Sequence, residues 1–225
     1  MLLKSLREEV LEANLELVRR GLVLYTFGNA NGISRKDGLI AIKPSGVPYE
    51  ELTLEKIVIT DIAGKTVEGD LRPSSDLATH VELYRQFPAV GGVAHTHSEF
   101  ATAWAQARRP IPCFGTTHAD YFHGPVPVTD PLTSDEISTE YERNTGIAIC
   151  RIFKHADPMA IQATLVSGHA PFCWGKNAAE AAQHAVILEY VAKMAYYTLG
   201  MRPDAEPLQS QLHDKHQLRK HGPAR

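Results

Sequence analysis

The sequence has 225 residues, which is long enough for one domain with a substantial hydrophobic core. Hydrophobic residues make up 44% of it and charged residues 22%, and the formal net charge is −3. This balance is ordinary for a globular protein and gives no reason to expect nucleic acid or an anionic membrane as a partner. No apolar run could span a bilayer or form the core of a signal peptide, so we expect a cytoplasmic protein with a single domain over residues 1–225.

The three cysteines argue against a framework of disulfides or thiolate ligands. Cys113, Cys150 and Cys173 are odd in number, widely spaced and form no Cys-x-x-Cys pair. Any metal would therefore depend on histidine and carboxylate, and the chain has 11 histidines.

The first part of the chain predicts a helix followed mainly by strands. Apolar residues at helical spacing predict a helix from Leu3 to Leu17, with Gly21 as its cap. The run from Leu22 to Phe27 predicts a strand or the approach to one, and the glycine- and asparagine-rich residues 28–32 predict a turn. The next expected elements are a hairpin over 33–43, strands over 57–60 and 66–68, and a helix that opens at 72–76 and is capped by Ser74 or Ser75.

The second part mixes helices and strands without strict alternation. The expected elements are a short strand ending near His97, a helix over 99–107, an irregular segment over 111–127, a helix from Thr133 through Glu142, a strand over 163–167, a helix over 178–199 capped by Asn177, and a last helix over about 207–220. This order predicts an α/β or α+β fold in layers, with a mostly antiparallel sheet flanked by helices.

His95 and His97 are the strongest candidates for chemistry. In a strand they point to the same face, because side chains repeat every two residues. Two imidazoles on one rigid edge supply two ligands of a zinc site, although histidines in such a strand can also be core residues. His169, next to Gly168 at a strand end, is a third candidate ligand.

Two loops have the composition of anion sites. Lys43-Pro44-Ser45-Gly46 offers a cation, a hydroxyl and backbone N–H groups that can form a nest, although the longer P-loop pattern is absent. Ser74-Ser75-Asp76 opens a helix, which suits either simple capping or a phosphate. Asp76 could also be an oxygen ligand of the metal, and His80, one turn later, is a spare ligand or a packed side chain.

The segment Gly115-Thr116-Thr117-His118-Ala119-Asp120-Tyr121 is chemically dense for a loop. Loops carry function when a rigid scaffold holds them. Asp120 could be a general acid/base, and it could equally be a turn or capping residue.

Taken together and in order, these motifs resemble the class II aldolase/adducin family, and within it the L-ribulose-5-phosphate 4-epimerase branch. The resemblance runs from Leu11-Glu12-Ala13-Asn14 to Arg219-Lys220-His221-Gly222. The motifs that carry it are Gly28-Asn29, Lys43-Pro44-Ser45-Gly46, Pro73-Ser74-Ser75-Asp76, His95-Thr96-His97-Ser98, Gly115 to Tyr121, His169-Ala170-Pro171-Phe172 and Trp174-Gly175-Lys176.

The resemblance implies a three-layer class II aldolase-like fold and a role for each motif. Asp76, His95, His97 and His169 would bind one Zn²⁺ per subunit, and Asp120 would be a catalytic acid/base that reaches the zinc of a neighbour in a cyclic homotetramer. The implied substrate and phosphate contacts are Gly28, Asn29, Ser45, Gly46, Ser74 and Ser75, with Lys43 assisting and Glu142 and His216 supporting the site.

The sequence departs from the family pattern at three places. Asn31 stands where relatives often have Ser, and Ala170 replaces the usual Gly after the last zinc histidine. Relatives continue past the region of His221-Gly222 into a tyrosine pair, one of which is a second proton-transfer group, whereas no tyrosine follows Tyr197 here. We expect that tyrosine beyond Arg225, or another acid in its place.

The implied reaction is zinc-dependent epimerisation at C4 of L-ribulose 5-phosphate to D-xylulose 5-phosphate. It proceeds by cleavage of the C3–C4 bond, rotation of the aldehyde fragment and re-formation of the bond. The alternative is a class II sugar-phosphate aldolase, in which the family tends to carry Glu where Asp76 stands. A dehydratase of the same fold and a non-catalytic module like the adducin head are more remote alternatives.

Overall fold

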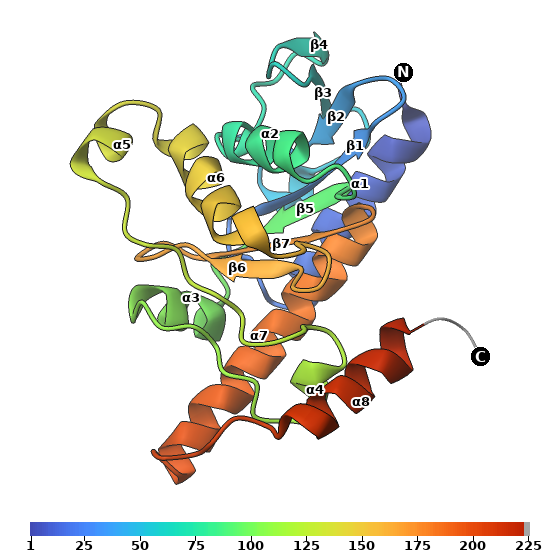
Figure 1. Ribbon diagram of the computed structural model, residues 1–225. Helices are drawn as coiled ribbons and strands as arrows, with labels where there is room; N and C mark the ends of the chain where they lie inside the picture. Colours follow the sequence, from blue (N-terminus) through green and yellow to red (C-terminus); the bar gives the residue numbers. More distant parts are fainter. Residues whose placement is uncertain (223–225) are drawn as a thin grey trace.

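Seven short strands pair into one antiparallel sheet in the computed structural model, which describes residues 1–222 (Figure 1). The strand order is β4-β3-β2-β1-β5-β7-β6. The strands are β1 (Asn29–Ser34), β2 (Leu39–Ile42), β3 (Val58–Asp61), β4 (Thr66–Glu68), β5 (Gly92–His95), β6 (Ala163–Leu165) and β7 (Pro171–Gly175).

Helices cover both faces of the sheet and give a three-layer α/β architecture, as the sequence predicted. Figure 1 shows α2 and α6 on one face and α1, α3 and α7 on the other, with α4 and α8 packed together beyond them. The helices are α1 (Lys4–Arg19), α2 (Leu77–Gln86), α3 (Glu99–Gln106), α4 (Thr116–Ala119), α5 (Ser134–Ser138), α6 (Tyr141–Ile152), α7 (Ala178–Met201) and α8 (Ser210–His221), with the 3₁₀ turns η1 (Tyr49–Glu51) and η2 (Phe153–His155). Over residues 1–222, none of these helices has both the length and the apolar character needed to cross a bilayer.

Alternation along the strands creates two separate cores. Small side chains point toward α1 and α7, and they let these two helices approach the sheet closely. Larger side chains point toward α2 and α6. The small residues include Ala30, Ala41, Ala94 and Cys173, and the larger ones include Ile33, Ile40, Ile42, Val93, Phe172 and Trp174.

The predictions for residues 22–32 were wrong in part. Leu22 to Phe27 is the approach to a strand and not a strand, because Tyr25 adopts a left-handed backbone with φ of 53° and several apolar side chains of the segment are exposed. Strand β1 begins instead at Asn29, inside the expected turn. The buried amides of Asn29 and Asn31 find hydrogen-bond partners there, so a polar segment can form a central strand.

Three helix boundaries also differ from the prediction. The expected helix over Thr133–Glu142 is two helices, α5 and α6, although the predicted capping box of Thr133 and Glu136 is present. Asp76, not a serine, occupies the N-cap of α2, and no side chain caps that helix end. The last helix begins at Ser210, and the predicted Asn177 cap of α7 is confirmed by its bond from the Glu180 amide.

The close contact between β5 and the start of α7 requires glycine at position 92. A Cβ atom at position 92 would lie 2.2 Å from the carbonyl carbon of Asn177 and 2.3 Å from the nitrogen of Ala178, both backbone atoms that cannot rotate away. We expect Gly92→Ala to lower the free energy of unfolding by about 3 kcal/mol, measured by urea denaturation. Gly200 lies in α7 with open space around it, so Gly200→Ala should raise the free energy of unfolding by about 0.5–1 kcal/mol. Equal urea midpoints for the two variants would contradict this account.

Candidate metal centre

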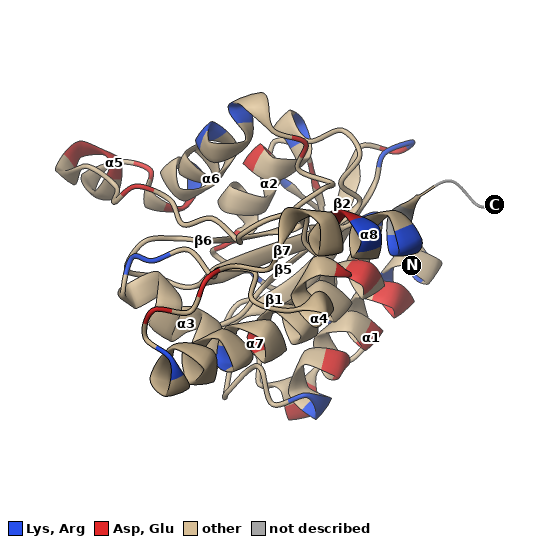
Figure 2. Cartoon of the chain, turned by 60° about the horizontal axis from the view of Figure 1, so that its bottom comes forward, with Lys and Arg blue, Asp and Glu red and all other residues tan. Residues whose placement is uncertain are grey.

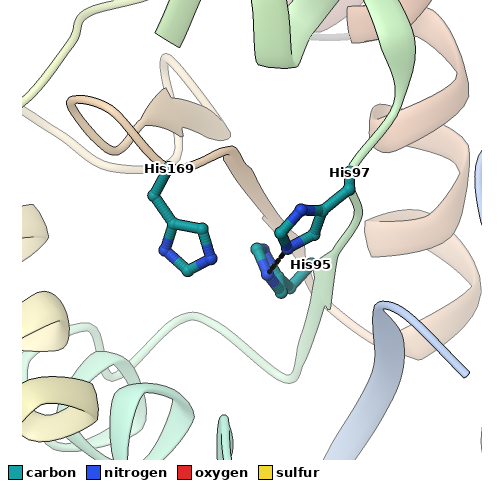
Figure 3. Close-up of side chains that lie close together, drawn as sticks. All are labelled: His95, His97 and His169. Atoms are coloured by element: carbon teal, nitrogen blue, oxygen red, sulfur yellow. Dashed lines mark hydrogen bonds between the residues drawn. The ribbon is translucent and has the colours of Figure 1, made fainter. Parts of the chain in front are cut away.

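Three histidines converge at one end of the sheet (Figure 3). His95 ends β5, His97 follows it by two residues, and His169 lies in the turn between β6 and β7. One ring nitrogen from each lies within 4.8 Å of the others, and the Nε2 atoms of His95 and His97 are 3.1 Å apart. Ligands at about 2.0–2.1 Å around a tetrahedral ion are themselves about 3.3–3.4 Å apart, so the cluster is close to the spacing of a shared metal ion.

The ring of His95 is held so that one nitrogen remains for a ligand. Its Nδ1 donates a hydrogen bond to the carbonyl oxygen of Pro171 at 2.9 Å, which leaves the Nε2 lone pair directed at the other two histidines. The ring also stacks on Phe172, with centroids 4.1 Å apart and planes 15° apart. A backbone acceptor on the remote nitrogen is the usual way in which a protein fixes the tautomer of a metal-binding histidine.

Burial keeps all three imidazoles neutral. Desolvation, with a smaller effect of His97, lowers the pKa of His95 to about 3. Desolvation also lowers the pKa of His169 to about 4, and it lowers that of His97 against the opposing attraction of Asp76. Because a metal binds the neutral ring, the site is ready for a cation near neutral pH without first losing a proton.

Asp76 lines the same cavity as the histidines and is held by Asn29. The Nδ2 group of Asn29 donates to Oδ2 of Asp76 at 2.7 Å, and its Oδ1 accepts from Nε2 of His80 at 3.1 Å. His80 is fully buried, and desolvation lowers its pKa to about 3, so it acts as a neutral donor that orients the amide. His80 therefore packs behind the site. Asp76 lines the cavity, but the group of ligand atoms within 4.8 Å of one another contains the three histidines and neither Asp76 nor His80.

The two predicted anion loops line one cavity together with the histidines. Its volume is about 390 Å³. Ser45 and Gly46 come from the loop after β2, and Ser74 and Ser75 precede α2. The complete lining is Thr26, Phe27, Gly28, Lys43, Pro44, Ser45, Gly46, Ser74, Ser75, Asp76, His95, His97, Tyr141, Glu142 and His169.

Lys43 brings a partly neutralised amine to this cavity. Its Nζ donates to the carbonyl oxygen of Val47 at 2.7 Å and lies 4.6 Å from the ring centroid of Tyr49. Desolvation lowers the pKa of Lys43 to about 8. An incoming phosphate would favour the charged form of this lysine, because an opposite charge nearby raises the pKa of an amine.

Asp120 lies apart from this cavity within one copy of the chain. His216 Nδ1 is 2.9 Å from its Oδ1, and Arg219 Nη2 is 3.0 Å from both carboxylate oxygens. Burial opposes ionisation of Asp120, but the hydrogen bonds from His216 and Arg219 outweigh it, and its pKa is lowered. Asp120 is thus an ionised carboxylate at the end of α4, and residues of α8 hold it in place. Its predicted catalytic role needs a cavity other than the one in its own chain.

The structure adds contributors to the cavity that the sequence did not single out. Tyr141, at the start of α6, places its hydroxyl 3.3 Å from Nδ1 of His169, and Phe27 lies 6.0 Å from the ring of His97. Tyr49 supports the floor, since its hydroxyl donates to the carbonyl oxygen of Gly28 at 2.9 Å. No sequence motif marks these aromatic residues, because each lies in an irregular segment or at the start of a helix, and only the tertiary fold brings it to the cavity.

Comparison with known proteins shows the family. Residues 8–196 match the Class II Aldolase and Adducin N-terminal domain, and the chain belongs to this family. The structure is similar to an L-fuculose 1-phosphate aldolase, with a TM-score of 0.81 and 25% identity over 96% of this chain and 95% of that one. It is also similar to YgbL from Escherichia coli, named as a candidate aldolase/epimerase/decarboxylase, with a TM-score of 0.76 and 26% identity over 95% and 98% of the two chains.

Metal content tests the histidine cluster directly. We expect the purified chain to keep one equivalent of zinc through dialysis against metal-free buffer, and His97→Ala to lose it, because removing one of three imidazoles weakens binding enough for the ion to be lost during dialysis. Emission spectrometry of the dialysed proteins measures this. The exposed His155 is the control, since His155→Gln should keep the full equivalent; equal zinc in His97→Ala and His155→Gln would refute the site.

Proposed function

We propose that this chain is a zinc-dependent sugar-phosphate epimerase that interconverts L-ribulose 5-phosphate and D-xylulose 5-phosphate. The observation that carries the proposal is the meeting, in one cavity of about 390 Å³, of three neutral histidines, Asp76 and two loops rich in serine and glycine. A metal group beside an anion-binding wall suits a substrate that has a ketone at one end and a phosphate at the other.

The chemistry explains why such a cavity is needed for an epimerase. The hydrogen on C4 of a 2-ketopentose is not acidic, so the centre is inverted by breaking and remaking the C3–C4 bond. A base takes the proton of the C4 hydroxyl, the bond electrons pass to C3 and the ketone, and glycolaldehyde phosphate is released within the site. A zinc ion, when bound by the histidines and Asp76, supplies Lewis acidity toward the ketone end of the substrate.

The protein must hold the phosphate while the aldehyde turns over. Ser45 and Gly46 on one loop and Ser74 and Ser75 on the other line the cavity, and they can donate hydroxyl and backbone hydrogen bonds. Gly46 has a φ of 71° and no atom close to where a Cβ would lie, so its backbone is open to a ligand. The tether keeps the fragment at high effective concentration, which favours recombination over escape.

Asp120 is the proposed acid/base, supplied by a neighbouring copy in a homotetramer. It is ionised, as a base must be, and His216 and Arg219 hold it in one orientation. Because it lies apart from the cavity of its own chain, sites between subunits would bring it to the substrate. Two proton-transfer groups on opposite faces are needed, and the second is the tyrosine, or its substitute, that the family resemblance implies.

An aldolase is the second candidate, and the similarity to an L-fuculose 1-phosphate aldolase favours it. It would use the same cavity but release its fragments. The difference lies at position 76: the shorter Asp76 is bonded to Asn29, which suits a ligand, whereas an aldolase base is expected on the longer Glu. Asp at this position therefore tilts the choice toward the epimerase.

The deciding experiment is a coupled assay for D-xylulose 5-phosphate formed from L-ribulose 5-phosphate, with parallel detection of free aldehyde. The epimerase predicts metal-dependent product and no free aldehyde, and loss of activity with a chelator that zinc restores. Asp120→Asn should lower kcat by about 10²–10⁴-fold, the usual contribution of one general acid/base. Accumulating aldehyde would identify an aldolase, and no turnover of either kind would reject both.

Subunit mixing tests whether Asp120 acts on a neighbour. Asp120→Asn and His97→Ala should each be inactive alone, but co-expression should restore about a quarter of wild-type activity, because about one site in four of a random cyclic mixture joins an intact histidine cluster to an intact Asp120. A mixture that stays inactive, although native mass spectrometry shows mixed oligomers, would place Asp120 outside the reaction at the neighbour's site.

A further inference from the structure

A second group of metal-binding side chains lies away from the cavity, where α8 packs against the segment that follows α4. It consists of His123, His213 and Asp214, whose ligand atoms all lie within 4.8 Å of one another. In the described part of the chain, only this group and the cavity histidines bring three such side chains so close. None of its members lines the cavity, and nothing in the proposed reaction uses them.

The separations in this group are too long for hydrogen bonds and right for a bridging cation. Nε2 of His123 lies 3.6 Å from Oδ1 of Asp214, and Nδ1 of His213 lies 3.5 Å from the same oxygen. A donor and acceptor at 3.6 Å form at best a weak hydrogen bond. Ligand atoms of a tetrahedral ion, bound at about 2.0–2.2 Å, are about 3.3–3.5 Å apart, so an ion can bond to all three with only small movements.

The two histidines lie on different elements with their rings stacked, so one ring must turn before both lone pairs can meet at one ion. Their ring centroids are 4.9 Å apart and their planes 25° apart. Nε2 of His213 is buried and has no hydrogen-bond partner within residues 1–222, so Nδ1 is the nitrogen that faces polar groups. A cation on Nδ1 would fix the tautomer of His213, and a small ring rotation of the half-exposed His123 would complete the approach.

We propose that His123, His213 and Asp214 form a second metal site, which takes a divalent ion that prefers imidazole and carboxylate ligands, such as Zn²⁺. Two imidazoles and one carboxylate are a known ligand set for zinc, and solvent can fill the remaining position because His123 and Asp214 are accessible. The same accessibility makes this site weaker than the buried histidine cluster, since water competes for the ion.

The ion would fasten α8 to the segment after α4. His123 follows Asp120 by three residues, while His213 and Asp214 precede His216 by less than one turn of α8. The metal would therefore join the two segments next to the hydrogen bonds that Asp120 accepts from His216 and Arg219. Figure 2 shows α8 and α4 adjacent, with charged residues of both signs along α8. A cross-link between segments that are far apart in sequence removes more conformational freedom from the undocked state than a short-range one does, so it favours the docked position of α8.

Isothermal titration of Zn²⁺ into untagged, full-length protein tests the site. His97→Ala supplies the background, because it weakens the cavity site and leaves the second group intact, and variants of the second group identify which ion that group binds. We expect one equivalent to bind in this background, and His123→Gln or Asp214→Asn added to it to weaken binding by about tenfold or more. His155→Gln, added in the same way, replaces an exposed histidine elsewhere and should leave the isotherm unchanged.

Amide hydrogen exchange measures whether the ion fastens α8 to the segment after α4. With Zn²⁺ present, the amides of α8 should exchange at least about tenfold more slowly in the His97→Ala background, and His123→Gln should abolish this protection. The proposal is overturned if no equivalent binds at 100-fold excess of Zn²⁺ over protein, or if binding survives both His123→Gln and Asp214→Asn. Neither result depends on turnover, so failure of the epimerase assignment leaves this test intact.

Discussion

The antiparallel register of β1, β5 and β7 is the constraint on which the site depends. Asn29 pairs with His95, and His95 pairs with Phe172, so these three side chains form one row across three strands. The chain can enter β1 in this register only because residue 28 is glycine. Its φ is 73°, and a Cβ there would lie 2.6 Å from the carbonyl oxygen of His95. A shift of one residue would turn His95 toward the opposite core, where small side chains leave no room for it.

The row explains both the rigidity of the histidine cluster and its state of protonation. Phe172 supports one face of the His95 ring, and the Pro171 carbonyl holds its Nδ1. The same packing excludes water from the ring, and exclusion of water is the largest cause of its lowered pKa. Asp76 opposes this effect at His97 without reversing it, so the pKa of His97 stays below its ordinary value. A divalent ion would be attracted both by the converging lone pairs of the three histidines and by the negative charge of Asp76.

The sequence predicted the parts of the molecule that depend on local rules. The capping box at Thr133 and the Asn177 cap follow from short-range geometry, and the structure has both. His95 and His97 come together as predicted, although β5 ends at His95 and His97 lies two residues beyond it. The mixture of periodicities predicted a layered architecture with a mostly antiparallel sheet, the family resemblance implied the three-layer α/β fold, and both are confirmed.

The failures have a common physical origin in tertiary contacts. Residues 28–32 look like a turn because glycine and asparagine favour turns, yet they form a central strand. Buried partners for Asn29 and Asn31 outweigh local preference, and the closeness of α1 requires a small residue at Gly32, where a Cβ would lie 3.0 Å from Leu6. No window of sequence contains this information, because the partners come from α1, α2 and β5. Tyr141 and Tyr49 were missed for the same reason.

Asp120 lies in a different part of the chain from the histidine cluster. Its partners, His216 and Arg219, lie on α8, which packs on α4 and not on the sheet that carries the histidines. A carboxylate paired with two basic groups stays ionised, and the catalytic role that we propose for it needs α8 to be docked firmly. The position of α8 therefore sets the position of the Asp120 carboxylate, whereas the strand register sets the positions of the histidines. If the proposed second metal group fastens α8, the chain would position Asp120 and the histidine cluster independently, one through a cation at its last helix and the other through the sheet.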